Sequence, residues 1–573
     1  MLQSLLYFFI ISFFCFTWGL PIIFFSQQKE TKIIVSLRDC IFLFFSGLCV
    51  LSIVSSWLCV VGPIKYWQLI ALTIPIIGVE LFWIRKGKLK FDINGLNVKL
   101  HFSEKVFLVI CLILFYYLSA GRPQMVDTDL YHLQSIKWIS EYGTIPGLAN
   151  IYLRFGFYSN WFHLISLFNF PFANQNFLYL NNALCIWTFF FLFFRYKKHS
   201  LLEGKQAMHF AILYFLLLVY SLYEWRLFRS TASSTSYDFI VTTITIIIIC
   251  LLLEKAFQLT KLQTPTFLLL LASVPFFKIT GIFLFVFLPV YFLLCGTTKK
   301  QITYFILIFL IAFFPYLYKN YMQTGYPFFP YNIIGFQAPD WQVPLQLVYH
   351  FNKFIYLTNH YINQSFPADA WTGGLHFSYI NDWFLHLTMP DKFMVALSLA
   401  GGAIGWVSFK KVYPSHLKKL IIIQAACYPP LIICLVISPD TRFVFGFLLM
   451  SSFIPISILL LKFWRRQFFY IGFILISFTS LKYVFDTWSN KFETSYLLKP
   501  PPTFIPPFKT VRINNFNYNT PEFSNLWSRR CFGIPLPCLY QTNGLLVPRG
   551  SNIKMGFRMN AISDSSFLRQ YQY

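Results

Sequence analysis

The chain runs, without a charge, through Val106-Phe-Leu-Val-Ile-Cys-Leu-Ile-Leu-Phe-Tyr-Tyr-Leu118 and then into Gly121-Arg-Pro-Gln-Met-Val-Asp127-Thr-Asp129-Leu-Tyr-His132. The first stretch has the character of a membrane span, and the second lies where the chain would leave the bilayer. It brings two carboxylates and an imidazole together, although the 573 residues include only 21 Asp and Glu. Such a cluster is a candidate for chemistry. A plainer alternative is that Asp127 or Asp129 caps a helix that runs through Ile136.

The composition of the whole chain indicates a membrane protein. Hydrophobic residues make up 57% and charged residues 12%, with a mean hydropathy of +0.59. A soluble domain averages about 25% charged residues. The apolar residues stand in long uncharged runs, which suit helices that satisfy their own backbone groups, whereas a transmembrane β-barrel would show short alternating segments. We therefore predict an all-α integral membrane protein, a polytopic helical bundle.

The pattern predicts thirteen or fourteen spans. The apolar segments fall at about 5–25, 41–61, 67–84, 106–118, 178–194, 208–222, 239–253, 266–277, 281–295, 304–318, 393–407, 420–438, 444–461 and 468–481. Several are shorter than the roughly 20 residues that cross a bilayer, so we expect their helices to extend into flanking sequence. Residues 266–295 read either as one broken helix or as two spans around Lys278, and two spans keep the alternation intact.

The net charge of +25 does not indicate a nucleic-acid-binding protein, because the basic residues form short clusters between apolar runs. By the positive-inside rule these clusters are cytoplasmic. That assignment puts the loops 119–177, 223–238 and 319–392, and the turn 439–443, on the outer side. It divides the chain into a transmembrane domain, 1–481, and an extracytoplasmic tail or small domain, 482–573. The clusters are Lys29/Lys32/Arg38, Arg85/Lys86/Lys88/Lys90, Arg195/Lys197/Lys198, Lys299/Lys300, Lys410/Lys411/Lys418/Lys419 and Lys462/Arg465/Arg466.

The polar tail contains two cysteines and a proline-rich run that indicate its structure. Ten of the 12 cysteines lie in or beside apolar segments, but Cys531 and Cys538 lie in the polar tail. If the tail is extracytoplasmic, a disulfide between these two is favoured by the oxidising environment. The proline-rich run 499–507 reads as a stiff extended spacer.

The first candidate site is centred on Asp127 and Asp129. If residues 128–139 are helical, Asp129 and His132 share one face, flanked by Gln134 and Trp138. A carboxylate in this position can act as a general base on a hydroxyl. Together the two carboxylates can also hold a hard divalent cation such as Mg²⁺ or Mn²⁺. The alternative is helix capping with surface polarity.

A second group of candidates suits phosphate. Arg226 and Arg229 precede a run of Ser and Thr on the predicted outer side, and guanidinium and hydroxyl groups together bind phosphate. Lys278 lies between apolar runs, where it either meets an anion or snorkels to the interface. Arg442 follows Asp440 in a short turn, where a local ion pair would also explain both charges. The Ser and Thr run reads equally as a flexible linker.

With this layout the chain resembles the GT-C superfamily of polytopic membrane glycosyltransferases. The resemblance rests on Asp127 and Asp129 in the first large outside loop, just after a span. The many spans, Lys278, Arg442 and the polar tail add to it. The runs Asp127-Thr-Asp-Leu-Tyr-His-Leu-Gln134 and Gly156-Phe-Tyr-Ser-Asn-Trp161 are also similar to an uncharacterised group of bacterial multi-span proteins related to that superfamily. The resemblance covers about residues 1–481.

The resemblance implies transfer of a sugar from a polyprenyl-phosphate donor to a cell-envelope glycan or lipid on the outer face of a bacterial inner membrane. Asp127 or Asp129 would be the base, assisted by His132. Arg226, Arg229, Lys278 and Arg442 would contact the donor phosphate, and a metal is not required. Acceptor or sugar contacts are expected from the group Tyr131, Gln134, Trp138 and Arg154.

Two other functions stay open. In an O-antigen or capsule polymerase, the functional residues would be Arg154, Arg226 and Arg229 rather than Asp127 and Asp129. A lipid-linked glycan transporter or flippase would need ionisable residues inside its spans, and the predicted spans are nearly free of charge apart from Lys278.

Overall fold

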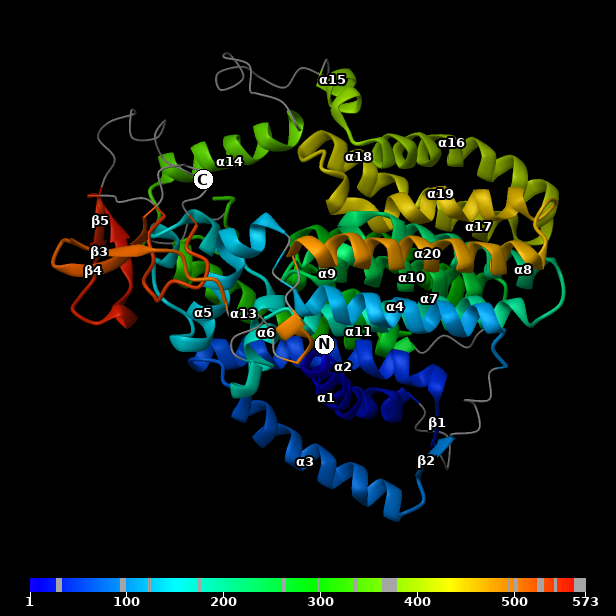
Figure 1. The fold of residues 1–573 in the computed structure, drawn as a ribbon, viewed down its shortest axis with the longest axis horizontal. Coiled ribbons are helices and arrows are strands. Elements are labelled where there is room, and N and C mark those ends of the chain that lie inside the picture. Colours follow the sequence, from blue (N-terminus) through cyan, green and yellow to red (C-terminus); the bar gives the residue numbers. More distant parts are fainter. Residues whose placement is uncertain are drawn as a thin grey trace.

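The structure, a computed structural model, is a bundle of long helices (Figure 1). It describes residues 1–26, 33–92, 99–121, 123, 125–173, 177–259, 264–296, 298–332, 338–362, 379–491, 494–498, 503–522, 530–540 and 544–560. Within these residues, 11 helices are long and apolar enough to cross a membrane. The predicted class, an all-α multi-pass membrane protein, is therefore confirmed.

The helices follow the predicted apolar segments along the chain. Their bounds are α1 Leu2–Ser26, α2 Leu37–Val61, α3 Tyr66–Arg85, α4 Phe102–Ala120, α5 Leu133–Glu141, α6 Asn160–Leu167, α7 Tyr179–Ser200, α8 Lys205–Tyr223, α9 Ser230–Ala232, α10 Asp238–Ala256, α11 Thr264–Phe277, α12 Phe287–Cys295, α13 Lys299–Thr324, α14 Leu345–His360, α15 Tyr379–His386, α16 Met389–Val412, α17 Leu417–Ala425, α18 Tyr428–Ile437, α19 Phe445–Leu460 and α20 Arg466–Lys491. Several extend past the apolar run into polar sequence, as expected: α13 continues six residues beyond the predicted end at 318.

The segment 266–295 forms a hairpin of two antiparallel pieces. Helix α11 ends at Phe277, Lys278 is extended, and a 3-10 helix, Ile279–Val286, leads into α12. Near the far end of the hairpin the Tyr291 hydroxyl donates to Thr264 Oγ1 at 2.9 Å. The chain therefore turns back at Lys278, as the two-span interpretation predicted.

The N-terminal helices pack backbone against backbone. A Cβ atom added at Gly19 of α1 would lie 2.1 Å from the carbonyl oxygen of Leu43, and one added at Gly47 of α2 would lie 1.8 Å from that of Cys15. Small residues at a helix crossing allow this approach, which is how helices associate where apolar burial gives little driving force. Helix α3 lies at the edge of the bundle (Figure 1), where Trp18 Nε1 of α1 donates to its Thr73 Oγ1 at 2.9 Å, and only 11% of its apolar window is buried.

One end of the bundle gathers the predicted cytoplasmic loops. His101, before α4, stacks on Tyr470 of α20, and the Tyr413 hydroxyl after α16 donates to the carbonyl of Lys205. We call this the basic end. The opposite end carries Asp127, and we call it the site end.

Two basic residues at the basic end are buried in ion pairs rather than exposed in a loop. Arg195 Nη1 lies 2.5 Å from Glu254, which also accepts hydrogen bonds from Tyr214 and contacts His199. Lys197 lies 2.7 Å from Glu104, whose side chain is 1% exposed. The expectation that Arg195 and Lys197 are loop charges is wrong, because α7 continues through both and turns them onto neighbouring helices.

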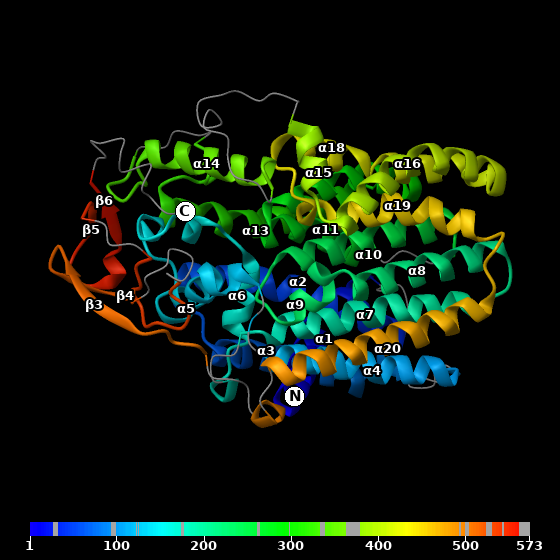
Figure 2. The ribbon, with the colours of Figure 1, turned by 45° about the horizontal axis from the view of Figure 1, so that its top comes forward.

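The C-terminal tail packs on the site end. Figures 1 and 2 place its strands beyond the ends of the long helices. Strands β3 and β4 form an antiparallel hairpin, and β5 pairs with β6. Two further short strands, β1 and β2, pair in parallel at the basic end. The strands are β1 Ile33–Ser36, β2 Leu89–Asp92, β3 Phe508–Ile513, β4 Phe516–Pro521, β5 Leu546–Pro548 and β6 Phe557–Met559.

Helix α5 holds the tail through its disulfide loop. Cys531 and Cys538 form the expected disulfide. Lys137 Nζ donates to the carbonyl of Gly533 at 2.8 Å, and Gln134 Nε2 donates to the carbonyls of Phe532 and Ile534 at 2.9 and 3.0 Å. The tail is thus a cover rather than a free appendage. The first part of the predicted spacer, 499–502, lies outside the described residues.

Replacing both Cys531 and Cys538 with Ala should loosen this cover. Closing a loop of this length stabilises by about 2.5 kcal/mol in the chain-entropy model. We expect limited proteolysis to cut the tail of the variant faster, while the helical part keeps its thermal midpoint. Cys295→Ala, at a free cysteine near the basic end, is the control. Equal cutting of wild type and double variant would contradict the expectation.

Candidate functional site

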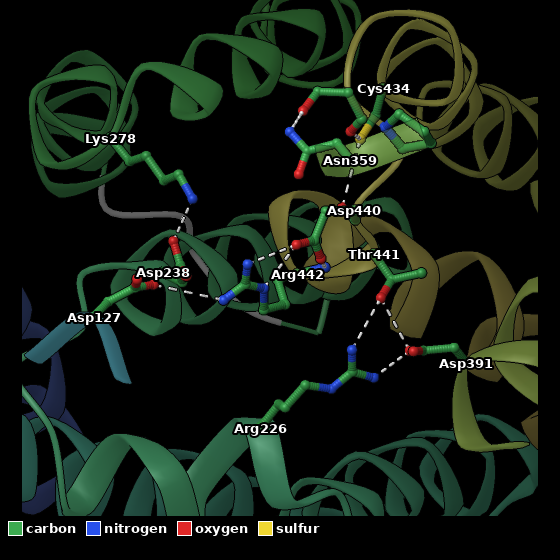
Figure 3. Close-up of polar contacts among 12 residues, drawn as sticks. Asp127, Arg226, Asp238, Lys278, Asn359, Asp391, Cys434, Asp440, Thr441 and Arg442 are labelled. Atoms are coloured by element: carbon green, nitrogen blue, oxygen red, sulfur yellow. Dashed lines mark hydrogen bonds and ion pairs between the residues drawn. The ribbon is translucent and has the colours of Figure 1, made fainter. Parts of the chain in front are cut away.

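The candidate site is a cluster of charged side chains at the site end, drawn in Figure 3. Its members come from segments far apart in the sequence. They are Asp127, Arg154, Glu224, Arg226, Asp238, Lys278, Asp391, Asp440 and Arg442. Acidic side chains in this set slightly outnumber basic ones, so the cluster is not a simple cationic pocket.

A π-helical turn, Thr128–His132, presents the carboxylate. The amide of Leu133 donates to the carbonyl of Thr128, five residues back, so this turn holds one residue more than an α-helical turn. The predicted continuous helix over 128–139 is therefore wrong in its first turn. In this register Asp127, rather than Asp129, shares the electrostatic environment of His132.

Asp127 is held as a carboxylate. Its side chain is 30% exposed, and its Oδ2 lies 3.8 Å from Nη1 of Arg442. Burial acts to raise the pKa of Asp127, but the positive charges of Arg442, Arg154 and Lys278 oppose it, and the pKa lies below its ordinary value. The group is thus ionised, partly open, and adjacent to a cation that it does not grip tightly.

Asp129 has a different environment. Burial raises its pKa to about 7, against the opposing charge of Arg530 in the tail. The two carboxylates thus have separate charge neighbours. Among the described residues no three His, Cys, Asp or Glu side chains gather as a metal site. A divalent cation at Asp127 would therefore need further ligands from substrate or water.

His132 is a neutral imidazole. It is 2% exposed, and burial lowers its pKa to about 4. Its Nδ1 lies 3.1 Å from Thr235 Oγ1, and its Nε2 is buried without a hydrogen-bond partner among the described residues. If Nδ1 carries the proton and donates to Thr235, Nε2 offers a lone pair beside Asp127.

Lys278 and Arg442 are paired with carboxylates of their own. Lys278 contacts Asp238 and lies 3.8 Å from the centre of the Phe443 ring. Arg442 holds Asp440 through Nε at 2.8 Å and Nη2 at 2.7 Å, so the local pair expected in this turn is present. Both cations therefore face the cluster with their charge already partly neutralised.

Arg226 ties three segments together. It contacts Glu224 at 3.0 Å and Asp391 on α16, and its guanidinium lies over the Phe445 ring. Thr441 Oγ1 donates to the same Asp391 at 3.0 Å. The expectation that Arg226 contacts a donor phosphate is not supported by this geometry, because two carboxylates occupy its donors. It positions the turn that carries Arg442.

The remaining predicted residues divide between the cluster and its supports. Arg154 lies over the Tyr131 ring, and Tyr131 shares a hydrogen bond of 2.9 Å with Tyr237. Arg229 contacts the carbonyl of Tyr223 and lies over the Tyr483 ring. Arg154 and Tyr131 are therefore beside Asp127, whereas Arg229 faces α8 and α20.

Gln134 and Trp138 are not open to a sugar in this structure. Both are fully buried. Gln134 bonds the disulfide loop, and Trp138 packs against Tyr142 and Phe557. The tail, almost 400 residues later in the chain, covers these two side chains.

Neither Asp391 nor Asp238 stands out in the sequence as a site residue. Asp391 is 1% exposed, and its backbone amide and carboxylate both bond Thr388, the N-cap of α16. The pattern Thr-x-x-Asp signals the helix start, but nothing local signals the contact to Arg226. Asp238 likewise stands in the first turn of α10 and reaches Lys278 across the fold.

The two carboxylates should respond to pH in opposite directions. The folded pKa of Asp129 is about 7 against an ordinary 3.8, so the folded state keeps its proton longer and stability falls as the pH rises through that window. Asp127 has a lowered folded pKa, so its contribution is present above 3.8 and is lost as the pH falls. Thermal midpoints from about pH 2 to pH 8 check this: Asp129→Asn should remove a decline between about pH 4 and 7, and Asp127→Asn should remove a rise that lies below about pH 4. Parallel profiles for the two variants would contradict it.

Comparison with known proteins gives a family but no activity. A family model described as Domain of unknown function (DUF8201) matches residues 1–449. No curated protein matches the chain. No solved structure matches it either.

Proposed function

The chain belongs to the DUF8201 family, a domain of unknown function, and we propose that it transfers a sugar from a polyprenyl-phosphate donor to a glycan or lipid acceptor at the site end. The observation that carries the proposal is Asp127: an ionised, partly exposed carboxylate just beyond the end of a predicted span, with Arg442, Arg154 and Lys278 around it. On this proposal the site end faces the outer side of a bacterial inner membrane.

Asp127 acts as the general base. It accepts the proton of the acceptor hydroxyl as that oxygen attacks the anomeric carbon of the donor sugar. The new C–O bond forms on the face opposite the phosphate, and the bond from the anomeric carbon to the phosphate oxygen breaks with its electron pair. A carboxylate that stays ionised is ready for this role, and the buried His132 lies beside it.

Lys278 and Arg442 stabilise the leaving phosphate. Charge develops on the phosphate oxygens as the bond breaks, and fixed cations in a partly buried site lower that cost. Because each cation already contacts an aspartate, the donor phosphate would compete with Asp238 for Lys278 and with the loosely held Asp127 for Arg442. The donor's arrival would then release Asp127 for the acceptor.

The geometry supports the rival functions less well. A polymerase would use Arg226, whose guanidinium is taken up by Glu224 and Asp391. A transporter would need charges inside the spans, whereas Glu104 and Glu254 lie in the end turns of α4 and α10, outside the predicted apolar runs. Each is bound to a basic partner at the basic end. These pairs are better explained as static supports.

The test is turnover by the purified chain in nanodiscs on a panel of polyprenyl-phosphate sugars. Release of sugar, or its transfer to an added acceptor, supports the proposal. The assay is run with Mg²⁺, with Mn²⁺ and with EDTA, which decides whether a cation takes part. Folded protein that binds no donor and releases no sugar from any donor overturns the proposal.

A further inference from the structure

The C-terminal cover carries a charge that membrane topology does not explain. Its described residues from 503 onward hold six basic side chains and one acidic side chain, Glu522. Basic loops at the basic end follow the positive-inside rule. A long segment on the other side crosses the membrane regardless of its charge, so its basic residues have no topological role. The six are Lys509, Arg512, Arg530, Arg549, Lys554 and Arg558.

Two of these cations are engaged with carboxylates of the bundle. Arg549 binds Asp340 through Nε at 2.8 Å and Nη2 at 2.9 Å, and Arg530 is the charge neighbour of Asp129. The other four, Lys509, Arg512, Lys554 and Arg558, are exposed and form no ion pair in the described part of the chain, although the charge of Arg558 also acts on Asp340. They give the outer surface of the cover a positive field.

The β3–β4 hairpin turns one face to solvent. Alternate residues of a strand point to opposite faces. Phe508, Thr510 and Arg512 lie on one face of β3, and all three are exposed. The other face packs inward through β4, where Tyr518 is 0% exposed. Asn517, directly opposite Arg512 in the register, is exposed as well.

This face combines the groups that bind an acidic sugar chain. The Phe508 ring can stack on the C–H face of a pyranose, Asn517 can bond hydroxyls, and the Arg512 guanidinium can hold a carboxylate or phosphate in a bidentate pair. The Thr510 hydroxyl donates to Asn519 Oδ1 at 3.0 Å. In both ribbon views the hairpin lies beyond the ends of the long helices, which favours a polymer in solution over lipid headgroups (Figures 1 and 2).

We infer that the exposed face of the β3–β4 hairpin binds an anionic glycan, with Arg512 at its acidic group and Phe508 on its ring. The further identification of that glycan as the acceptor rests on the proposed function. Lys509, Lys554 and Arg558 raise the local concentration of the polyanion through longer-range attraction, which salt screens.

The test measures binding of two labelled probes, an oligogalacturonate and a dextran of equal length, to the full chain in phosphatidylcholine nanodiscs. We expect the acidic probe to bind at least tenfold tighter and to weaken with salt. The variant Phe508→Ala/Arg512→Gln should lose about tenfold, as for a charge-assisted hydrogen bond. Lys410→Gln/Lys411→Gln, which removes two exposed charges at the basic end, should bind as wild type.

Several outcomes overturn the inference. Equal binding of both probes, or unchanged binding by the hairpin variant, removes it. Displacement of the probe by phosphatidylglycerol vesicles, but not by excess unlabelled oligogalacturonate, assigns the face to a membrane instead. Protease resistance of the tail shows that the hairpin variant has kept its fold, and Arg512→Lys, which retains the charge, should restore part of the affinity.

The inference and the proposed function fail separately. Asp127→Asn should bind the acidic probe as wild type does, since it leaves the hairpin intact. Binding without any sugar transfer by wild type would sink the transferase and leave the glycan site standing. Transfer by wild type with no preference for acidic acceptors would leave the transferase standing and overturn the identification of the bound glycan as its acceptor.

Discussion

Asp127→Asn is expected to lower kcat for sugar transfer by about a thousandfold, while the donor binds at least as tightly as before. An amide cannot accept the acceptor's proton, and loss of a positioned base costs roughly 10²–10⁴ in rate. Removing a negative charge beside Arg442 also leaves that cation more available to the phosphate. The change should therefore appear in kcat and not in KM for the donor.

Two comparisons make this result specific. Asp382→Asn alters an exposed carboxylate of α15, outside the charge cluster, and should retain full turnover. Asp129→Asn should keep most of the rate, because Asp129 faces Arg530 and the tail. Wild-type turnover in Asp127→Asn and in Asp129→Asn alike would remove the base from the mechanism. A loss in Asp129→Asn alone would move the role of the base to Asp129.

Glu254→Gln is expected to destabilise the bundle by about 3–5 kcal/mol, the usual cost of leaving a buried cation without its partner. Glu254 is 0% exposed and contacts Arg195, His199 and Tyr214 together. The amide can keep one hydrogen bond but not the charge. A fall in the denaturant or thermal midpoint in detergent measures the effect.

The matched control is Glu203→Gln, an exposed carboxylate at the same end of the bundle. It should shift the midpoint by less than about 0.5 kcal/mol, as surface changes do. The single variant Glu254→Leu should be destabilised as Glu254→Gln is. The double variant Arg195→Met/Glu254→Leu should recover much of that lost stability, since replacing a whole buried pair with apolar groups is often nearly neutral. No recovery would mean that His199 and Tyr214 depend on Glu254 as much as Arg195 does.

Local composition was sufficient to predict the multi-pass helical class and the disulfide. A long apolar run between basic clusters forms a helix in a bilayer, because its backbone N–H and C=O groups must hydrogen-bond to one another. The predicted segments accordingly lie on helical structure, but among the described residues 11 helices, rather than thirteen or fourteen, are long and apolar enough to span. The segment 420–438 is divided between α17 and α18, and α7, which carries 178–194, is not one of the 11. The turn at Lys278 separates two shorter apolar pieces. The pairing of Cys531 with Cys538 needed only their isolation in a polar tail.

The charge cluster could be predicted only in part, because its contacts join distant residues. The position of Asp127 after a span was visible in the sequence, but its companions were not. Asp391 meets Arg226 across 165 residues, and the tail reaches Gln134 across 398. The π-helical register at Thr128 also has no simple sequence signal, and it decides which aspartate stands beside His132. A pattern reports what a residue can do locally, not which remote partner occupies it.

A π-helical turn can be regarded as an α-helix into which one residue has been inserted. Removing one residue from Thr128–His132 would let the turn relax into the α-helical register, leaving α5 and its hold on the tail in place. The segment before it would rotate by roughly 100°, the angle of one α-helical residue. Asp127 would then leave the neighbourhood of Arg442 and His132. A single-codon deletion or insertion at this turn can thus move Asp127 out of or into the charge cluster, whose other members stand on other segments.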